Sequence, residues 1–299
     1  MLICVIMLSQ EVISAIEKLL SDELGECVVI SNTSTVGGGC INDCYRIQTN
    51  CGVFFVKTNS ANRYPGMFEA EAKGLQLLKK SETIYIPKVI AFGEATDDSF
   101  LVLEYIDSGR KQPAFWEDFG RSLAQMHRNS TDYFGLDHDN YIGSLPQSNH
   151  QHNDWISFFI EERLEAQLKR AMESGKINKS TIQQFNRLYT KLKAIFPEEA
   201  PALLHGDLWS GNYMAGSNGE PCIIDPAVYY GHREMDIGMS QLFGGFSSKF
   251  YDAYNTEYPL ENGWQQRIEI CNLYPLLVHV NLFGGSYLMQ VQSILRRFV

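Results

Sequence analysis

The segment His205-Gly206-Asp207-Leu208-Trp209-Ser210-Gly211-Asn212 follows an apolar run, and Ile223-Ile224-Asp225-Pro226 comes shortly after it. Together the two segments place two carboxylates and one carboxamide at the ends of apolar stretches. An Asp and an Asn separated by four residues, with a second Asp beyond a short hairpin, are typical of metal-dependent phosphoryl transfer. The alternative is that these are ordinary turn residues. Polar groups beside an apolar run, however, would be half buried, which is unfavourable unless a partner or a function requires them at these positions.

The pattern assigns a role to each polar side chain. Asp207 would orient and deprotonate an attacking hydroxyl, while Asn212 and Asp225 would hold Mg²⁺ against nucleotide phosphates. We expect His205 to orient this loop through hydrogen bonds rather than to exchange protons.

Composition narrows the class of protein. The 299 residues, 44% of them hydrophobic and 20% charged, suffice for one large domain or two lobes. A net charge of −10 argues against nucleic acid or an anionic membrane as a partner. The seven cysteines are irregularly spaced without a CxxC motif, which favours reduced thiols in the cytoplasm. The apolar start is too short to span a bilayer, and Met7 could be the natural first residue.

Periodicity predicts a small α+β lobe over residues 1–106, with five strands around one helix. A further helix over residues 10–20 would begin behind the N-cap Ser9. The predicted strands cover residues 27–31, 44–47, 53–57, 87–92 and 100–106, and the main helix covers residues 68–78. The first three strands would form an antiparallel meander.

Residues 107–299 are predicted to form a mostly helical lobe, with the boundary near Ile106–Gly109. Its one small hairpin would turn at Ser217–Gly219. The predicted helices cover residues 116–127, 154–172, 179–195, 234–243 and 264–298, the last with a break at Gly284-Gly285. Residues 129–153 are polar and irregular, and His150 and His152 there lack the spacing of metal ligands. His127 is expected to be a packed core residue.

Three consecutive glycines precede the second strand: Gly37, Gly38 and Gly39. Glycines let backbone N–H groups approach phosphate oxygens, although such a triplet is often only a turn. Lys57 ends the apolar strand Phe54-Phe55-Val56 and would be costly there unless it faces an anion. Glu71 lies on the helix face turned toward the sheet and could pair with Lys57. Glu69 is better explained as a solvated residue near the helix N-terminus.

Two further predictions concern the nucleotide and the glycine loop. Main-chain groups of Glu104 and Ile106, on the strand that leads into the second lobe, could bind an adenine edge. Cys40 follows the glycines, where backbone N–H groups would lower a thiol's pKa. It could therefore be an oxidisable thiol that regulates activity, or a reduced thiol packed under the sheet.

From about residue 27 to 299 the chain resembles the fructosamine kinase (ketosamine-3-kinase) family. This family belongs to the aminoglycoside- and choline-kinase-like phosphotransferases with a two-lobed protein-kinase-like fold. The segment HGDLWSGN is the most specific motif. The resemblance also rests on Gly37–Ile41, Phe55–Lys57, Met67–Glu71, Asp225–Ala227, Tyr230–Glu234 and Leu242–Phe246. Asp225-Pro226-Ala227 stands where protein kinases have DFG, which matches the family.

The resemblance implies roles for individual residues. Asp207 would be the catalytic base, Asn212 and Asp225 would bind Mg²⁺, and Lys57 with Glu71 would position ATP. Asp236 would brace the catalytic loop through main-chain N–H groups, or simply cap its helix. Trp209, whose flat indole stands beside the base, would stack on a sugar or its amine adduct, unless it is buried in the core.

The implied acceptor is a ketosamine: a fructosamine, ribulosamine or erythrulosamine, free or on a protein lysine. Phosphorylation of its third-carbon hydroxyl would serve deglycation repair, by a monomer or weak homodimer. A kinase of the same fold for an aminoglycoside, choline or another amino alcohol is the alternative. A nucleotide-binding module without turnover is the rival from another class.

Overall fold

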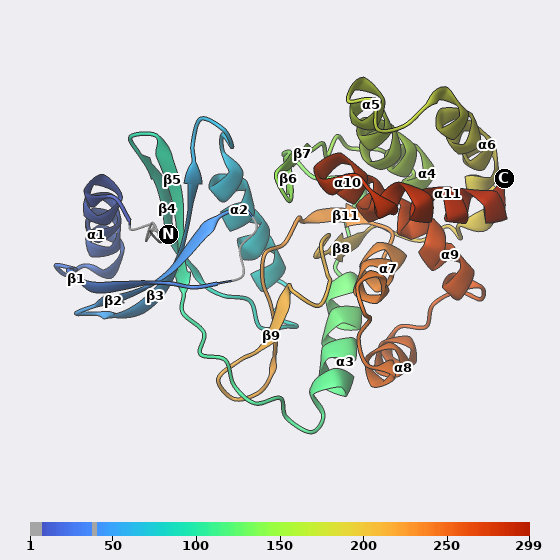
Figure 1. The fold of residues 1–299 in the computed structure, drawn as a ribbon. Coiled ribbons are helices and arrows are strands. Elements are labelled where there is room, and N and C mark those ends of the chain that lie inside the picture. The colour runs from blue at the N-terminus through green and yellow to red at the C-terminus, as the bar shows by residue number, and fades with distance from the viewer. Residues whose placement is uncertain (1–7, 38–40) are drawn as a thin grey trace.

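The computed structural model describes residues 8–37 and 41–299 and consists of an antiparallel sheet followed by a mostly helical part (Figure 1). The sheet has the order β1-β2-β3-β5-β4. Its strands are β1 (Ile30–Thr35), β2 (Asp43–Thr49), β3 (Gly52–Ser60), β4 (Val89–Ala95) and β5 (Asp98–Glu104). The five strands and the opening meander are confirmed. The prediction of the first strand at residues 27–31 is wrong, because the polar residues of β1 pair with β2 as far as Thr35.

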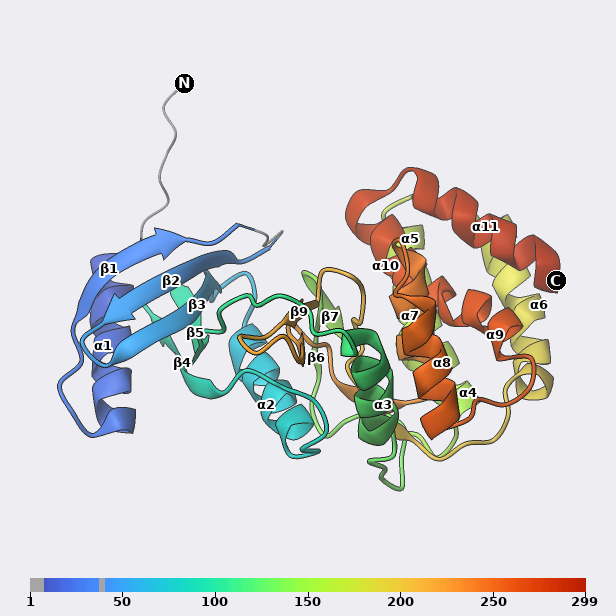
Figure 2. The same ribbon diagram turned by 90° about the horizontal axis from the view of Figure 1, so that it is seen from below.

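Two helices cover the sheet, one on each face, rather than one helix at its centre (Figures 1 and 2). Side chains alternate between the faces of a strand. Phe100 and Val102 of β5 therefore pack with α1 (Gln10–Leu24), while Leu101 and Leu103 pack with α2 (Met67–Lys79). The Ser9 side chain caps α1 by accepting a hydrogen bond from the Val12 N–H at 3.3 Å.

The remaining chain is mostly helical and also carries short strand pairs. Its helices are α3 (Phe115–His127), α4 (Trp155–Phe158), η1 (Phe159–Glu165), α5 (Ala166–Glu173), α6 (Lys179–Ile195), α7 (Glu234–Leu242), α8 (Ser248–Glu257), α9 (Trp264–Cys271), α10 (Leu273–Phe283) and α11 (Ser286–Phe298). Its strands are β6 (Asn140–Ile142), β7 (Leu145–Gln147), β8 (Ala202–Leu204), β9 (Tyr213–Ala215), β10 (Pro221–Ile223) and β11 (Tyr229–Gly231). Within residues 8–37 and 41–299, no helix combines the length and the apolar character needed to cross a bilayer.

Several predicted elements need correction. Residues 154–172 are not one α-helix, because the π-helical η1 interrupts it. Residues 264–298 break at Asn272 as well as at the predicted Gly284-Gly285. Helix α8 and the β6–β7 hairpin were not expected, since these short segments depend on tertiary packing rather than on a long periodic pattern.

Two strand pairs, rather than one hairpin, flank the loop that holds residues 205–212. The predicted hairpin is β9–β10, and its turn contains Gly219 at φ 85°. The pair β8–β11 holds residues 202–204 beside residues 229–231. A hydrophobic cluster continues from Leu101 and Leu103 of the sheet to Phe115 and Phe250 of the helical part. We propose that the chain divides into lobes at residues 1–106 and 107–299, packed through this shared cluster.

Candidate active site

The loop between β8 and β9 is fixed by hydrogen bonds to its backbone. Asp236 of α7 accepts from the N–H of His205 at 2.7 Å and from the N–H of Gly206 at 2.9 Å. Gly206 has a φ of 81°, and a Cβ there would collide with the Ala227 carbonyl oxygen. A side chain at residue 206 would therefore displace the loop from Asp236.

Two histidines support this loop. His205 does so directly, as a neutral imidazole, and His127 does so through its contact with Asp236. His205 Nε2 lies 2.9 Å from the Ile224 carbonyl, so this nitrogen carries the proton, and Nδ1 accepts from the Asp207 N–H at 3.2 Å. Burial lowers the pKa of His205, which keeps the imidazole neutral. His127, buried as expected, places Nε2 3.2 Å from Asp236 Oδ2 and Nδ1 2.8 Å from the Tyr254 hydroxyl.

Asp207 lies in this loop with its carboxylate held by Asn212. The Asn212 Nδ2 donates to Asp207 Oδ2 and to the Asp207 carbonyl oxygen, both at 2.9 Å. Burial raises the pKa of Asp207 to about 7, although the hydrogen bond from Asn212 acts in the opposite direction. A carboxylate with a pKa near neutrality is well matched to accepting a proton from a hydroxyl.

Lys57 of β3 connects the sheet to this loop region. Its ammonium lies 2.7 Å from Glu71 Oε1 on α2 and 3.0 Å from Asp225 Oδ1. Burial alone would lower the pKa of Lys57, but the charges of Asp225 and Glu71 raise it above its ordinary value. Glu69 instead pairs with Lys73 at the surface, at 2.8 Å.

Asp225 occupies a strained backbone position two residues after the end of β10. Its φ is 55°, which a residue with a Cβ seldom adopts. The side chain is 46% exposed although it pairs with the buried Lys57. Strain of this kind persists where the surrounding structure enforces it, often at functional sites.

The donor set formed by Asn212 and Asp225 fits a hard divalent cation. The Asn212 Nδ2 also lies 3.3 Å from the Asp225 carbonyl oxygen, so the two residues are adjacent. The Asn212 Oδ1 accepts no hydrogen bond from residues 8–37 or 41–299, and the Asp225 carboxylate reaches solvent. One amide oxygen and one carboxylate are the ligand types that Mg²⁺ prefers.

These side chains line a cavity of about 460 Å³. Lys57 and Glu71 enter it from the sheet and α2, whereas Asp207, Asn212 and Asp225 enter it from the helical part. The cavity therefore brings together the candidate base, the candidate cation ligands and the buried lysine.

Trp209 stands at the cavity and is 37% exposed, which excludes burial in the core. Its indole packs over Gly211, where any Cβ would collide with the ring. The ring centroid lies 6.1 Å from that of Phe243, at nearly a right angle. Trp209 thus presents an aromatic surface beside Asp207.

Sequence reasoning missed the rest of an aromatic wall along the cavity. The ring of His279 lies 4.7 Å from that of Phe243 and 4.9 Å from that of Tyr287. Phe283, which is 64% exposed, completes the wall 5.5 Å from His279. The available signals were the Gly244-Gly245 and Gly284-Gly285 pairs, which end α7 and α10 beside these aromatic residues.

The remaining residues that were predicted to bind the nucleotide are only partly supported by the structure. The Glu104 N–H donates to the Lys88 carbonyl at 2.9 Å, so the prediction that it is free for adenine is wrong. Ile106 makes no main-chain hydrogen bond to the described part of the chain and remains a candidate, as does the Glu104 carbonyl. Gly37 is described, but Gly38, Gly39 and Cys40 lie outside the described residues. The glycine-loop and thiol predictions therefore stay predictions.

The Tyr230–Glu234 block does not contribute to the cavity lining. Arg233 donates to both oxygens of Glu199 at 2.8 Å, and Glu234 receives a bidentate pair from Arg267. This block anchors the start of α7, the helix that supplies Asp236.

A two-part fold with a sheet lysine paired to a helix glutamate, and an Asp–Asn loop followed by a second Asp, defines the protein-kinase-like class of phosphotransferases. A solved aminoglycoside phosphotransferase shares this fold, with a TM-score of 0.65 and 15% identity over 96% of this chain and 99% of that one. The chain belongs to the fructosamine kinase family, which it matches over residues 12–299.

Several relatives within this family are similar over nearly their whole length. The probable ketoamine kinase of Enterococcus faecium is 42% identical over 88% of this chain and 94% of its own. The chloroplastic protein-ribulosamine 3-kinase of Arabidopsis thaliana is 41% identical over 91% of this chain and 83% of its own. A solved Haemophilus somnus structure described as a fructosamine-3-kinase has a TM-score of 0.85 and 32% identity, covering 95% of this chain and 96% of that one.

Proposed function

We propose that this protein transfers the γ-phosphoryl group of ATP to the third-carbon hydroxyl of a ketosamine. The acceptor would be a fructosamine, ribulosamine or erythrulosamine, free or on a protein lysine. The observation that carries the proposal is that Asp207 lines one cavity together with Trp209 and the candidate cation ligands, and accepts a hydrogen bond from one of these ligands, Asn212. The names of the relatives, ketoamine kinase and protein-ribulosamine 3-kinase, support the same acceptor class.

The chain's own residues account for acceptor activation. The Asp207 carboxylate would accept the proton of the acceptor hydroxyl as that oxygen bonds to the γ-phosphorus and ADP leaves. The hydrogen bond from Asn212 holds the carboxylate in place, and Asp236 fixes the backbone on which it stands. Preorganisation of this kind lowers the barrier by positioning rather than by covalent chemistry.

The remaining groups would act on the nucleotide and on the sugar. Lys57, held by Glu71, would neutralise phosphate oxygens. Asn212 and Asp225 would hold Mg²⁺, which supplies electrostatic stabilisation of the phosphate charge when bound. The aromatic wall headed by Trp209 suits both the apolar face of a sugar and the cationic amine of a ketosamine.

We also propose that the protein works in the cytoplasm as a monomer or weak homodimer. The irregular spacing of the seven cysteines, without a CxxC motif, supports a reducing compartment. The net charge of −10 is compatible with a cationic amine substrate and unfavourable for nucleic acid.

The test is ATP consumption measured against a panel of ketosamines, aminoglycosides and choline, with a glycated protein as a further acceptor. We expect turnover with at least one ketosamine and none with choline or an aminoglycoside. Turnover restricted to the aminoglycosides or choline would overturn the proposed acceptor class while leaving the phosphotransferase chemistry intact. An Asp207→Asn control run in parallel shows whether any ATP loss comes from this site.

A further inference from the structure

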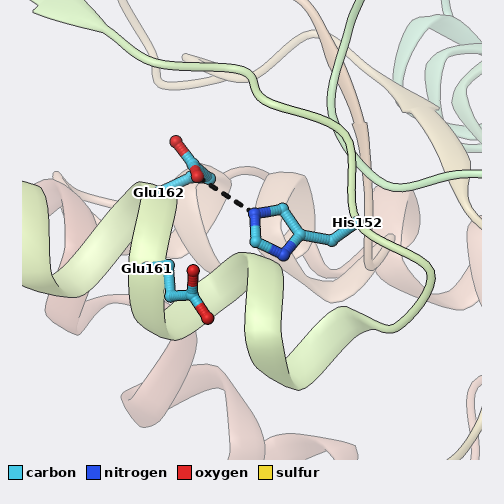
Figure 3. Close-up of side chains that lie close together, drawn as sticks. All are labelled: His152, Glu161 and Glu162. Atoms are coloured by element: carbon cyan, nitrogen blue, oxygen red, sulfur yellow. Dashed lines mark hydrogen bonds and ion pairs between the residues drawn. The ribbon is translucent and has the colours of Figure 1, made fainter.

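A second cluster of ligand-type side chains lies outside the candidate active site. His152, in the segment after β7, and Glu161 and Glu162 of η1 place one potential ligand atom each within 4.8 Å of one another (Figure 3). His152 Nε2 is 3.0 Å from Glu162 Oε1. His150 Nδ1 lies 3.6 Å from Glu162 Oε2 and can join the group, because its side chain is 80% exposed. The two histidines therefore meet carboxylates from a different segment, which their own spacing could not indicate.

Glu162 is a nearly buried carboxylate without a permanent cation beside it. The residue is 9% exposed, and within the described residues its ion-pair partners are only His150 and His152. The neighbouring Arg163 forms no ion pair with the Glu162 carboxylate and donates instead to the main-chain carbonyls of Ser148 and Glu162 and to Asn149 Oδ1. Ser148 and His152 both hydrogen-bond to the Glu162 carboxylate, but neither is a fixed positive charge. A buried negative charge requires a compensating positive charge.

The backbone that carries the two glutamates is itself unusual. Residues Phe159–Glu165 form a π-helical stretch between α4 and α5. A π-helical turn holds more residues than an α-helical turn, so consecutive side chains such as Glu161 and Glu162 diverge less around the axis. Figure 3 shows both carboxylates projecting from the helix near the imidazole of His152, with the hydrogen bond between His152 and Glu162 as a dashed line. Such stretches are rare and occur frequently at functional sites.

We propose that His152, Glu161 and Glu162, with His150 as a fourth ligand, bind a divalent transition-metal ion of the Zn²⁺ type. Imidazole nitrogen and carboxylate oxygen are both Zn²⁺ ligands, and four of them complete its usual tetrahedral set. Nitrogen ligands disfavour Mg²⁺, which separates this site chemically from Asn212 and Asp225. The ion would supply the positive charge that Glu162 lacks.

The location gives the ion a structural consequence. The segment that carries His150 and His152 follows the β6–β7 hairpin, and Asn140, Tyr141 and Ile142 of β6 line the active-site cavity. Asn149 in the same segment receives a hydrogen bond from Arg163 of η1. A bound ion would add to the hydrogen bonds that already join η1 to this segment. We therefore expect it to raise the thermal stability of the protein.

The test is calorimetric titration of the full-length protein with Zn²⁺ alone as the added ligand, in a buffer with excess Mg²⁺ to occupy the active site. We expect one Zn²⁺ per chain and an increase in Tm on binding. Glu161→Gln should weaken binding by more than about tenfold, since even indirect partners of a metal ligand contribute about 10–100-fold to affinity. Glu161 is exposed and makes no side-chain hydrogen bond or ion pair within the described residues, so this variant should fold.

Two control variants show which residues bind the Zn²⁺ ion. Glu173→Gln removes an equally exposed carboxylate from α5 and should leave Zn²⁺ affinity unchanged. Asp225→Ala, in the active site, should also retain it. Binding that is unaltered in Glu161→Gln, or that disappears only in Asp225→Ala, would overturn the assignment. So would a wild-type protein that takes up no Zn²⁺ in the presence of Mg²⁺.

Discussion

Replacement of Lys57 by Met tests how much the ion pairs of this buried lysine contribute to the stability of the candidate site. Methionine keeps most of the aliphatic stem and removes the ammonium, which lies 2.7 Å from Glu71 and 3.0 Å from Asp225. The side chain of Glu71 is 11% exposed, whereas that of Asp225 is 46% exposed and can be hydrated. The loss of stability should therefore come mainly from Glu71, which would be left as an unpaired, nearly buried charge. Removing one partner of a buried pair costs about 3–5 kcal/mol of unfolding free energy.

The second variant, Glu71→Gln, shows whether this reasoning is right. In the Lys57→Met background it removes the stranded charge, so the double variant should be more stable than the sum of the single changes predicts. For two residues in direct contact we expect a coupling of about 2–3 kcal/mol. Burial raises the pKa of Glu71, and the loss of Lys57 removes the main opposing effect. The folded Lys57→Met protein then binds a proton more readily than the unfolded chain, so its deficit should shrink as the pH is lowered.

The assay is urea unfolding of the four proteins of this cycle at neutral and mildly acidic pH, with ATP affinity measured on each. Lys57→Met should also weaken ATP binding, because the nucleotide loses a buried cation. A destabilisation below about 1 kcal/mol would refute the reasoning, since it would place Lys57 in the range of surface pairs. Strict additivity of the two substitutions would refute it as well.

Three further predictions concern chemistry, cation and substrate. Asp207→Asn should lower kcat by about 10²–10⁴-fold with ATP affinity nearly intact, because a general base contributes about that much; more than a tenth of wild-type kcat would remove Asp207 from this role. Asp225→Ala should reduce ATP affinity only when Mg²⁺ is present, and equal losses in titrations with and without Mg²⁺ would indicate a structural role. Trp209→Ala should raise KM for a ketosamine more than KM for ATP, since one aromatic contact contributes about 0.5–1.5 kcal/mol; an unchanged KM for the ketosamine would contradict it.

Much of the candidate site could be predicted because its chemistry is local in sequence. Asp207 and Asn212 stand in one loop, and Asp225 follows after a single hairpin, so spacing alone groups them. Lys57 is conspicuous as a charge directly after three apolar residues, although the strand does not end there as predicted, because β3 continues to Ser60. The choice of Glu71 over Glu69 needed only helical periodicity, which turns one glutamate toward the sheet and the other toward solvent.

The rest depended on tertiary structure. The aromatic wall joins Trp209 to His279 and Tyr287, which come from segments far apart along the chain, and no local pattern couples them. The π-helical η1 consists of ordinary helix-forming residues, so the spacing of its apolar residues predicts a continuous α-helix and does not reveal the wider turn. The Glu104 N–H was expected to be free, but the Lys88 carbonyl outside the strands accepts it. The aromatic wall and the Glu104 N–H both depend on residues that are distant in the sequence, which local patterns do not reveal.

The charges of the cavity constrain how a nucleotide can be bound. Among the described residues, Lys57–Asp225 is the ion pair that joins the sheet to the helical part. A phosphate that paired with Lys57 in place of Asp225 would leave the Asp225 carboxylate without its cation and close to a second anion. The half-buried Asp207 nearby would add to this repulsion, because Asp225 already raises its pKa. Asp225 can release Lys57 without cost only if another cation neutralises it, so nucleotide affinity at this site should depend on a divalent cation more steeply than charge screening alone requires.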